Sequence, residues 1–198
     1  MLVSARKAAF LDRDGVLNAL VADPVSGLAE SPLRADDVRL LAGVGEGAKS
    51  LMGEGYALVC VSNQPAAAKG TVSTEQLWAV HERVVELLVR EGVRLDASSL
   101  CLHHPEGVVP EYSGVCGCRK PAPGMLLKAA EDLGLDLERS WMIGDTDADV
   151  RAGRAAGCRT VLIECAGSAH KRTGDASPDL VASDLADAAA RLLDLCRH

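Results

Sequence analysis

Two carboxylates, Asp12 and Asp14, stand at the end of a short apolar stretch, in the sequence F-L-D-R-D-G. Residues two apart in an extended chain point to the same side, so these side chains would repel each other unless a positive group lay between them. A hard divalent cation such as Mg²⁺ is bound by carboxylate oxygens of this kind. The pair alone fits either a cation site or a solvated polar turn.

A further carboxylate, Asp145, ends the apolar stretch Trp141 to Ile143 in the sequence I-G-D-T-D-A-D. Asp145 lies at the strand end, where a helix cap is not yet needed. Carboxylates from two separate strand ends can make the oxygen site that Mg²⁺ uses when it also retains waters and a substrate phosphate. The sequence therefore predicts Mg²⁺ between Asp12, Asp14 and Asp145, which would supply the positive charge that the first pair lacks.

Two other strand ends carry groups that suit a phosphate. In V-S-N-Q-P, the Ser62 hydroxyl, the Asn63 carboxamide and the turning backbone N–H groups could hold a phosphate oxygen, although an ordinary polar turn has the same composition. In R-K-P, Arg119 and Lys120 precede a helix start, where cations oppose the helix dipole. Two cations in that place indicate an anion nearby.

The elements that must bring these residues together read as repeated βα units, which predict an α/β fold with a central parallel sheet covered by helices on both sides. The carboxyl ends of parallel strands meet at one edge, where ligands bind in such sheets. The expected strands are Ala8 to Leu11, Tyr56 to Val61, Ser98 to Leu102, Ser140 to Ile143, Thr160 to Ile163 and Leu180 to Ala182. The expected helices are Val44 to Met52, Ser73 to Glu91, Gly124 to Leu133, Ala148 to Ala156 and Asp184 to Leu195.

A third feature is a cluster of metal-binding residue types. Cys101-x-His103 and, after twelve intervening residues, Cys116-x-Cys118 supply three thiolates and one imidazole, a closed ligand set for structural Zn²⁺. Reduced cysteines gathered in a loop by chance are the alternative. A metal would supply folding energy to a segment with few apolar residues, and it would fix where the following Arg119 points.

Composition sets the remaining limits. At 198 residues, with 48% apolar and 25% charged residues, the chain suits one globular domain spanning 1–198. The net charge of −7 disfavours nucleic-acid and anionic-membrane partners, and no apolar stretch is long enough to span a membrane. We expect a cytoplasmic protein. The oligomeric state is left open, with a monomer as the expectation.

The four strand-end motifs, D-R-D-G-V, V-S-N, R-K-P and G-D-T-D-A-D, occur in the order found in the haloacid dehalogenase superfamily of phosphatases. The chain resembles this superfamily over nearly its whole length. Within it, C-L-H-H-P followed by C-G-C-R-K-P is similar to the D-glycero-D-manno-heptose 1,7-bisphosphate 7-phosphatases and the histidinol-phosphate phosphatases. The resemblance implies a Rossmann-like three-layer fold without a large cap domain, Mg²⁺, a zinc-stapled loop at about 101–118 and a phosphoaspartyl intermediate.

Residue roles follow from the same resemblance. It implies Asp12 as the nucleophile and Asp14 as the acid and base, while Ser62 and Lys120 would stabilise the transferring phosphoryl group. It places Mg²⁺ on the Asp12 and Asp145 side chains and the Asp14 main-chain carbonyl. Asn63 and Arg119 are expected to bind substrate, and the zinc ligands are expected to be Cys101, His103, Cys116 and Cys118.

Some residues depart from the family pattern. Thr146 stands where the heptose phosphatases usually have a lysine, and Pro65-Ala66 replaces a flexible Ser-Gly pair, for which Lys69 would compensate. The segment Asn18 to Asp37, which should overhang the site, is longer and more acidic than expected and is the predicted place of substrate choice.

The favoured function is Mg²⁺-dependent hydrolysis of a sugar phosphate, the 7-phosphate of D-glycero-D-manno-heptose 1,7-bisphosphate. Histidinol phosphate or another small phosphate monoester is the nearest alternative substrate. A mutase of the same superfamily is less favoured, because no cap that would exclude water is visible. A catalytically inactive, zinc-stapled binding module is the remote alternative, since every acid and base that the reaction needs is present.

Overall fold

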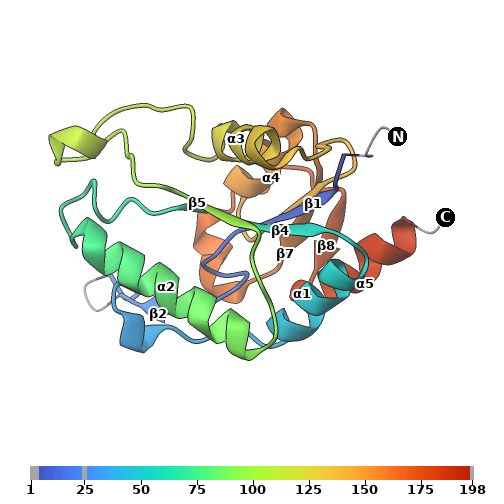
Figure 1. Ribbon diagram of the computed structural model, residues 1–198. Coiled ribbons are helices and arrows are strands. Elements are labelled where there is room, and N and C mark those ends of the chain that lie inside the picture. The colour runs from blue at the N-terminus through green and yellow to red at the C-terminus, as the bar shows by residue number, and fades with distance from the viewer. Residues whose placement is uncertain (1–4, 24–25, 197–198) are drawn as a thin grey trace.

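The computed structural model describes residues 5–23 and 26–196, which form a six-stranded parallel sheet between two layers of helices (Figure 1). The strand order is β5-β4-β1-β6-β7-β8, so the first strand lies in the middle. These strands are β1 (Ala8–Leu11), β4 (Ala57–Asn63), β5 (Ala97–Cys101), β6 (Trp141–Gly144), β7 (Arg159–Ile163) and β8 (Leu180–Ala182). The predicted α/β fold with a central parallel sheet is confirmed.

Five α-helices cover the sheet. They are α1 (Val44–Gly53), α2 (Thr74–Arg90), α3 (Gly124–Leu133), α4 (Asp147–Ala156) and α5 (Leu185–Leu195). Three short 3₁₀ helices lie in loops, namely η1 (Ala35–Asp37), η2 (Pro110–Tyr112) and η3 (Ala166–Lys171). The boundaries of the α-helices and of the main strands lie within two residues of those expected from the sequence.

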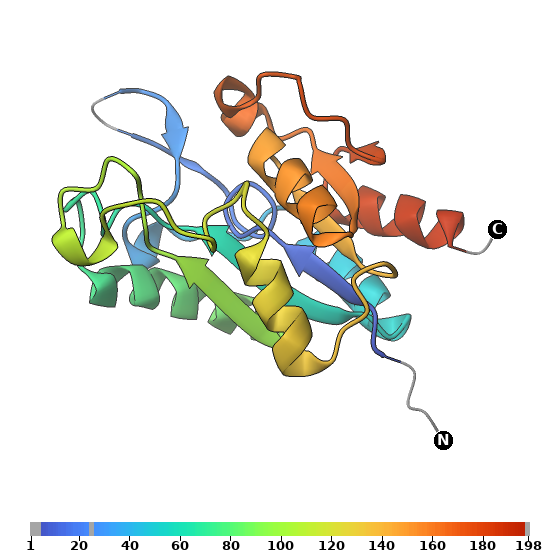
Figure 2. The ribbon, with the colours of Figure 1, turned by 90° about the horizontal axis from the view of Figure 1, so that it is seen from above.

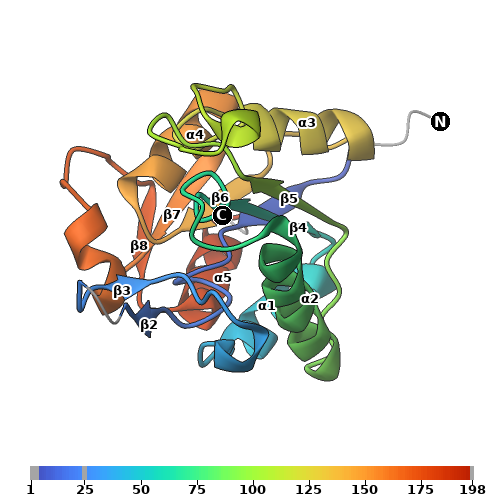
Figure 3. The same ribbon diagram turned by 90° about the vertical axis from the view of Figure 1, so that its left-hand side faces the viewer.

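Side-chain alternation along the strands divides the core between the two faces of the sheet. Leu11, Cys60 and Ile143 belong to the apolar cluster under α1, α2 and α5, whereas Phe10 and Val59 belong to the cluster under α3 and α4. The two helix layers lie on opposite sides of the sheet in Figures 1 and 3. Strands buried on both faces explain why β1 and β4 read as unbroken apolar stretches.

Helix α2 illustrates how the sequence sets a boundary. Ser73 caps its first turn in a reciprocal capping box with Gln76, as the sequence predicts. Its buried stripe contains Leu77, Val80 and Val84, which recur at helical spacing. The helix therefore lies with one face against the sheet.

Two long segments gather at the carboxyl end of the sheet. The segment expected as an irregular loop contains a two-stranded antiparallel hairpin, β2 (Val21–Ala22) and β3 (Ala29–Glu30). The other segment, between β5 and α3, carries the cysteine and histidine cluster (Figure 2). Strands of two residues give too short a pattern to be predicted. Pro24 and Val25, within the hairpin segment, lie outside the described residues.

Glu30 of the hairpin forms an ion pair of 2.6 Å with Lys171 at the end of η3, so the hairpin is tied to the β7–β8 side of the sheet (Figure 3). Across the part of the chain that the structure describes, no helix is both long and apolar enough to span a bilayer.

Candidate active site

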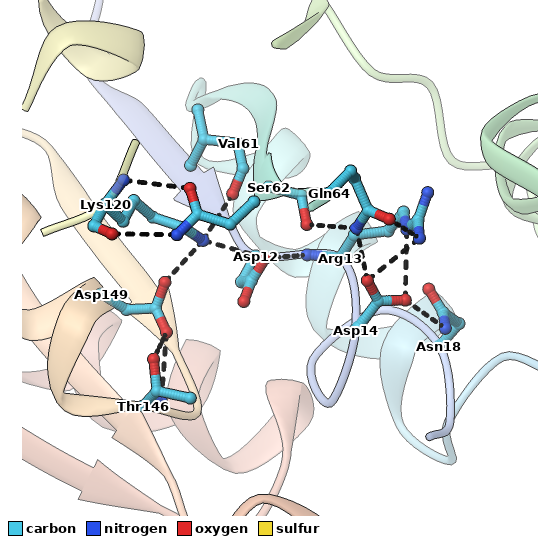
Figure 4. A network of polar contacts seen from close by, with 11 residues as sticks. Asp12, Arg13, Asp14, Asn18, Val61, Ser62, Gln64, Lys120, Thr146 and Asp149 are labelled. Atoms are coloured by element: carbon cyan, nitrogen blue, oxygen red, sulfur yellow. Dashed lines mark hydrogen bonds and ion pairs between the residues drawn. The ribbon is translucent and has the colours of Figure 1, made fainter. Parts of the chain in front are cut away.

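The carboxyl end of β1 brings Asp12 against a lysine from a distant loop. Lys120 Nζ lies 2.9 Å from Asp12 Oδ1, 2.6 Å from Asp149 Oδ1 and 2.8 Å from the Val61 carbonyl oxygen (Figure 4). The lysine is only 3% exposed. Burial by itself would lower the pKa of Lys120, but Asp12 and Asp149 outweigh burial and hold it above its usual range. The ammonium group is therefore a fixed positive charge.

Three buried carboxylates surround this charge. Asp12, Asp145 and Asp149 each place an oxygen within 4.8 Å of the others; Asp12 directly follows β1, Asp145 directly follows β6, and Asp149 lies in α4. Burial raises the pKa of Asp12 to about 6, a rise that Lys120 opposes and Asp149 increases. Burial, with the charges of Asp12 and Asp149, raises the pKa of Asp145 to about 8.

The oxygen cluster fits a divalent cation. Three carboxylates face one ammonium group, so an excess of negative charge remains when all are ionised, and oxygen-only donors are those that Mg²⁺ prefers. Gly15 lies directly against Asp145, because a Cβ on this glycine would come 2.0 Å from Asp145 Oδ2. The turn after β1 thus approaches Asp145 closely enough for one ion to contact both strand ends.

Asp149 takes part directly in this cluster of charges. One of its oxygens contacts Lys120, and the other accepts hydrogen bonds from the Thr146 backbone N–H (3.1 Å) and hydroxyl (2.6 Å). Thr146 caps α4 through this pairing. Thr146 therefore fixes the orientation of Asp149.

Asp14 lines the cavity but is held in a separate network (Figure 4). Its oxygens accept hydrogen bonds from Arg13 Nε (3.2 Å) and Nη2 (3.0 Å), Asn18 Nδ2 (2.9 Å) and Gln64 Nε2 (2.6 Å). Burial alone would raise the pKa of Asp14, but the Arg13 guanidinium and these hydrogen bonds outweigh it and lower the pKa.

Ser62 and Asn63 end β4 beside this network. Asn63 pairs through both ends of its carboxamide with the backbone of Lys120, accepting from its N–H (3.0 Å) and donating to its carbonyl oxygen (2.9 Å). Ser62 Oγ accepts a hydrogen bond of 3.0 Å from Gln64 Nε2. Both Ser62 and Asn63 line the same cavity as Asp12.

The four predicted zinc ligands lie together, Cys101 at the end of β5 and the other three in the loop that follows it. The three sulfur atoms of Cys101, Cys116 and Cys118 are 3.1–3.6 Å apart, and His103 Nδ1 lies 3.6 Å from Cys118 Sγ. All seven cysteines are free. A tetrahedral Zn²⁺ with Zn–S bonds of about 2.3 Å separates its sulfur ligands by about 3.8 Å, so the cluster is close to the size that zinc requires.

A cavity of about 340 Å³ opens over Asp12 and is bordered by basic side chains. Lys69, His104 and Arg119 lie along it, and Arg119 donates to the His103 carbonyl oxygen at 3.1 Å. Burial lowers the pKa of His104, and the charges of Arg119 and Lys69 lower it further. The zinc cluster and the rim of the cavity are thus physically connected through Arg119.

Sequence reasoning missed three participants in this site. Arg13 and Gln64 hold Asp14, and Glu30 from the hairpin lines the cavity. Arg13 stands between two aspartates directly after an apolar stretch, which was the available signal in the sequence, and the structure buries it completely. Gln64 and Glu30 carry no such signal, because their partners Asp14 and Lys171 are 50 and 141 positions away in the chain.

A parallel α/β sheet with carboxylates at its strand ends, and a lysine that a loop brings against them, defines a class, the HAD-like hydrolases. A family model described as HAD-hydrolase-like matches residues 117–188. The chain is 38% identical to the D-glycero-beta-D-manno-heptose-1,7-bisphosphate 7-phosphatase of Yersinia pestis, over 91% of this chain and 92% of that protein. It is 39% identical to the D-glycero-D-manno-heptose-1,7-bisphosphate 7-phosphatase of Thermosynechococcus vestitus, over 98% and 97%.

A solved structure leads to the same family. The D,D-heptose 1,7-bisphosphate phosphatase from B. bronchiseptica, complexed with magnesium and phosphate, aligns with a TM-score of 0.73 and 28% identity, over 96% of this chain and 99% of that one. The chain belongs to the HAD-like hydrolase family. Within this family it is a phosphoric monoester hydrolase.

Proposed function

We propose that this protein hydrolyses the 7-phosphate of D-glycero-D-manno-heptose 1,7-bisphosphate through a phosphoaspartyl intermediate. The observation that carries the proposal is the contact of Asp12 with Lys120 at the floor of a cavity that also contains Asp145 and Asp149. The names of the relatives supply the substrate, since they are heptose bisphosphate phosphatases over almost the whole chain.

In the first step, an Asp12 carboxylate oxygen attacks phosphorus and the bond to the sugar oxygen breaks. Lys120, held against Asp12, neutralises charge on the transferring oxygens, and the Ser62 hydroxyl donates to one of them. The Arg13 network favours ionised Asp14 in the resting site, so Asp14 must release one of its donors and take up a proton from water before it protonates the departing sugar alkoxide. The products of this step are the free sugar hydroxyl and an acyl phosphate on Asp12.

In the second step, a water molecule attacks the phosphorus of the acyl phosphate. Asp14, now ionised, accepts a proton from this water, and the bond to Asp12 breaks to release inorganic phosphate. Asp14 thus acts as an acid toward the leaving sugar and then as a base toward the incoming water. It regains in the second step the proton that it gave up in the first.

Mg²⁺ is proposed to bind the Asp12 and Asp145 side chains together with the Asp14 main-chain carbonyl. The cation would neutralise the negative charge shared by phosphate and carboxylates. Asp149 supports this site by contacting Lys120 while Thr146 fixes its other oxygen. The magnesium in the B. bronchiseptica enzyme supports Mg²⁺ as the cation.

The basic rim is suited to the second phosphate of a bisphosphate. Lys69, His104 and Arg119 lie along the cavity beyond Asp12, and Arg119 offers a planar guanidinium that can bind two phosphate oxygens at once. We assign Zn²⁺ to the ligands Cys101, His103, Cys116 and Cys118, which would order the loop carrying Arg119.

The test is a comparison of kcat/KM for heptose 1,7-bisphosphate, the 1-phosphate and the 7-phosphate of the same sugar, and histidinol phosphate, with and without Mg²⁺. We expect Mg²⁺-dependent release of the 7-phosphate and a preference for the bisphosphate. Arg119→Ala should raise KM for the bisphosphate more than for the 7-phosphate alone, because only the bisphosphate has a second phosphate that Arg119 can bind. A preference for histidinol phosphate would overturn the sugar substrate, and no phosphate release from any of these would overturn the proposed activity.

A further inference from the structure

The Gln64 carboxamide connects two parts of the site that have separate tasks in the proposed reaction. Its Nε2 donates to both Asp14 Oδ2 (2.6 Å) and Ser62 Oγ (3.0 Å), and its Oε1 accepts from Arg13 Nη2 (2.8 Å) (Figure 4). The side chain is 1% exposed. Both N–H groups of the amide and one lone pair of its oxygen are therefore used inside the protein.

Its neighbours fix which way this amide points. Arg13 can only donate hydrogen bonds, so it must face the amide oxygen, and an ionised Asp14 can only accept them, so it must face the amide nitrogen. A flipped amide would place two donors together and two acceptors together. Gln64 consequently holds a single orientation between Arg13 and Asp14.

This orientation determines what the Ser62 hydroxyl can do. Because Gln64 Nε2 donates to Ser62 Oγ, the serine oxygen acts as an acceptor there, and its own proton is available to another partner. Ser62 lines the cavity over Asp12. The hydroxyl is thereby set to donate into the cavity, where the reacting phosphate would lie.

The same amide group limits how Asp14 can move. Each Asp14 oxygen already accepts two hydrogen bonds, which fills the four lone-pair positions of a carboxylate. To exchange a proton with a sugar or a water, Asp14 must release one of these donors. The Gln64 bond is the shortest of the four and comes from the residue that also holds Ser62.

We propose that Gln64 is a positioning residue that directs the Ser62 hydroxyl toward the reacting phosphate and holds the Asp14 carboxyl beside the leaving group, within reach of the proton transfer that follows release of one of its donors. The inference rests on the proposed function. It extends that function by making one buried amide responsible for the alignment of a phosphate donor with an acid and base.

The test uses two substrates that differ in their leaving groups. A sugar phosphate must gain a proton as its alkoxide leaves, whereas the acetate of acetyl phosphate leaves without one, so only the first depends on Asp14 in the step that kcat/KM reports. The variant is Gln64→Met, which keeps the length of the side chain and removes all three hydrogen bonds. Two reference variants separate the two roles: Asp14→Asn removes the proton transfer to the leaving group, and Ser62→Ala removes the hydroxyl that donates to the phosphate.

We expect Gln64→Met to lower kcat/KM for the sugar phosphate by about 10²-fold, and to lower it for acetyl phosphate at least about tenfold less. Asp14→Asn should show the same imbalance, whereas Ser62→Ala should lower both values to a similar extent. An equal loss on both substrates, or no loss, would overturn the proposal. A wild-type enzyme that releases no phosphate from sugar phosphates would instead refute the proposed function.

Gln64→Glu covers the case in which the methionine variant does not fold. It keeps the volume and the contact with Arg13 but replaces the donor facing Asp14 by an acceptor. We expect the same shift in the ratio of the two kcat/KM values with a folded protein, measured by circular dichroism and thermal unfolding. A wild-type ratio in folded Gln64→Glu would overturn the proposal.

Discussion

Asn63 and Lys120 lie 57 positions apart in the chain, yet the carboxamide of the first pairs with both the backbone N–H and the carbonyl oxygen of the second. A carboxamide matches a peptide group in hydrogen-bonding geometry, so this pairing ties the end of β4 to the loop that carries the lysine. The ammonium group of Lys120 then extends to Asp12 from a backbone that cannot shift freely.

Asn63→Ala should therefore lower kcat, because Lys120 loses the anchor that aligns it with Asp12. A displacement of the order of 1 Å costs about 100-fold in rate, and we expect a loss of about 10- to 100-fold in kcat with a smaller change in KM. Steady-state kinetics on the best substrate measures both. Asn63→Asp keeps the acceptor for the Lys120 N–H and should lose less activity than the alanine variant. Equal activities for Asn63→Ala and the wild type would contradict this role.

Asp12→Asn should abolish turnover with little loss of stability. The amide is similar in size but is not a nucleophile, so no acyl phosphate can form. Mass spectrometry of acid-quenched protein should detect a phosphorylated form in the wild type and none in the variant. Asp36→Asn is the matched control, since Asp36 is exposed and lies outside the site, and it should keep full activity. Phosphate release by Asp12→Asn at the wild-type rate would refute the nucleophile.

Gly15→Ala should weaken Mg²⁺ binding. Gly15 has a φ of +86°, and the added methyl group would come 2.0 Å from Asp145 Oδ2, so the carboxylate must move. Gly55→Ala is the control, because Gly55 has a φ of +80° with no atoms near its missing Cβ and carries the same backbone strain alone. Thermal unfolding with and without Mg²⁺ should show a stabilisation by the ion in Gly55→Ala and a much smaller one in Gly15→Ala. The same Mg²⁺ response in both variants would contradict the placement of the ion at Asp145.

Cys116→Ser should lower bound zinc, the unfolding temperature and the affinity for substrate. A structural zinc site contributes folding energy directly, and the loop that it orders carries Arg119 beside the cavity. Cys165→Ser is the control, because Cys165 is partly buried but lies outside the cluster. Elemental analysis, thermal unfolding and KM together distinguish the two variants. A zinc content unchanged in Cys116→Ser would refute the ligand assignment.

His81 should make the protein sensitive to acid. Burial, and then the charge of Arg13, lowers the pKa of His81 to about 4 from 6.5. A histidine whose pKa is lower in the folded than in the unfolded state stabilises the fold fully above pH 6.5, and this contribution is lost as the pH falls from 6.5 to 4. At 1.36 kcal/mol per pH unit, the loss is at most about 3 kcal/mol. Urea unfolding at pH 7 and pH 4 should show a smaller difference in His81→Gln than in the wild type, and equal differences would exclude this histidine as the cause.

The order of the elements was predictable because each one has a local cause. The apolar stretch of β1, the capping box at Ser73 and the helical stripe containing Leu77 all act over a few residues, so they can be read along the chain. The hairpin β2–β3 escaped prediction because its two-residue strands depend on pairing with each other. That residues 1–198 form one domain, and that the protein is cytoplasmic, stay predictions.

The candidate site also has a part that the sequence predicts and a part that only the tertiary structure reveals. The sequence by itself determined the chemical groups, since Asp12, Lys120, Asp145 and the clustered cysteines are identified by residue type and spacing in short motifs. Only the tertiary structure decided how they are oriented, for example that Asn63 holds Lys120 and that Gln64 joins Ser62 to Asp14. The physical reason is that a hydrogen bond depends on distances of a few tenths of an ångström between residues about 50 positions apart, and these distances are set only when the sheet packs.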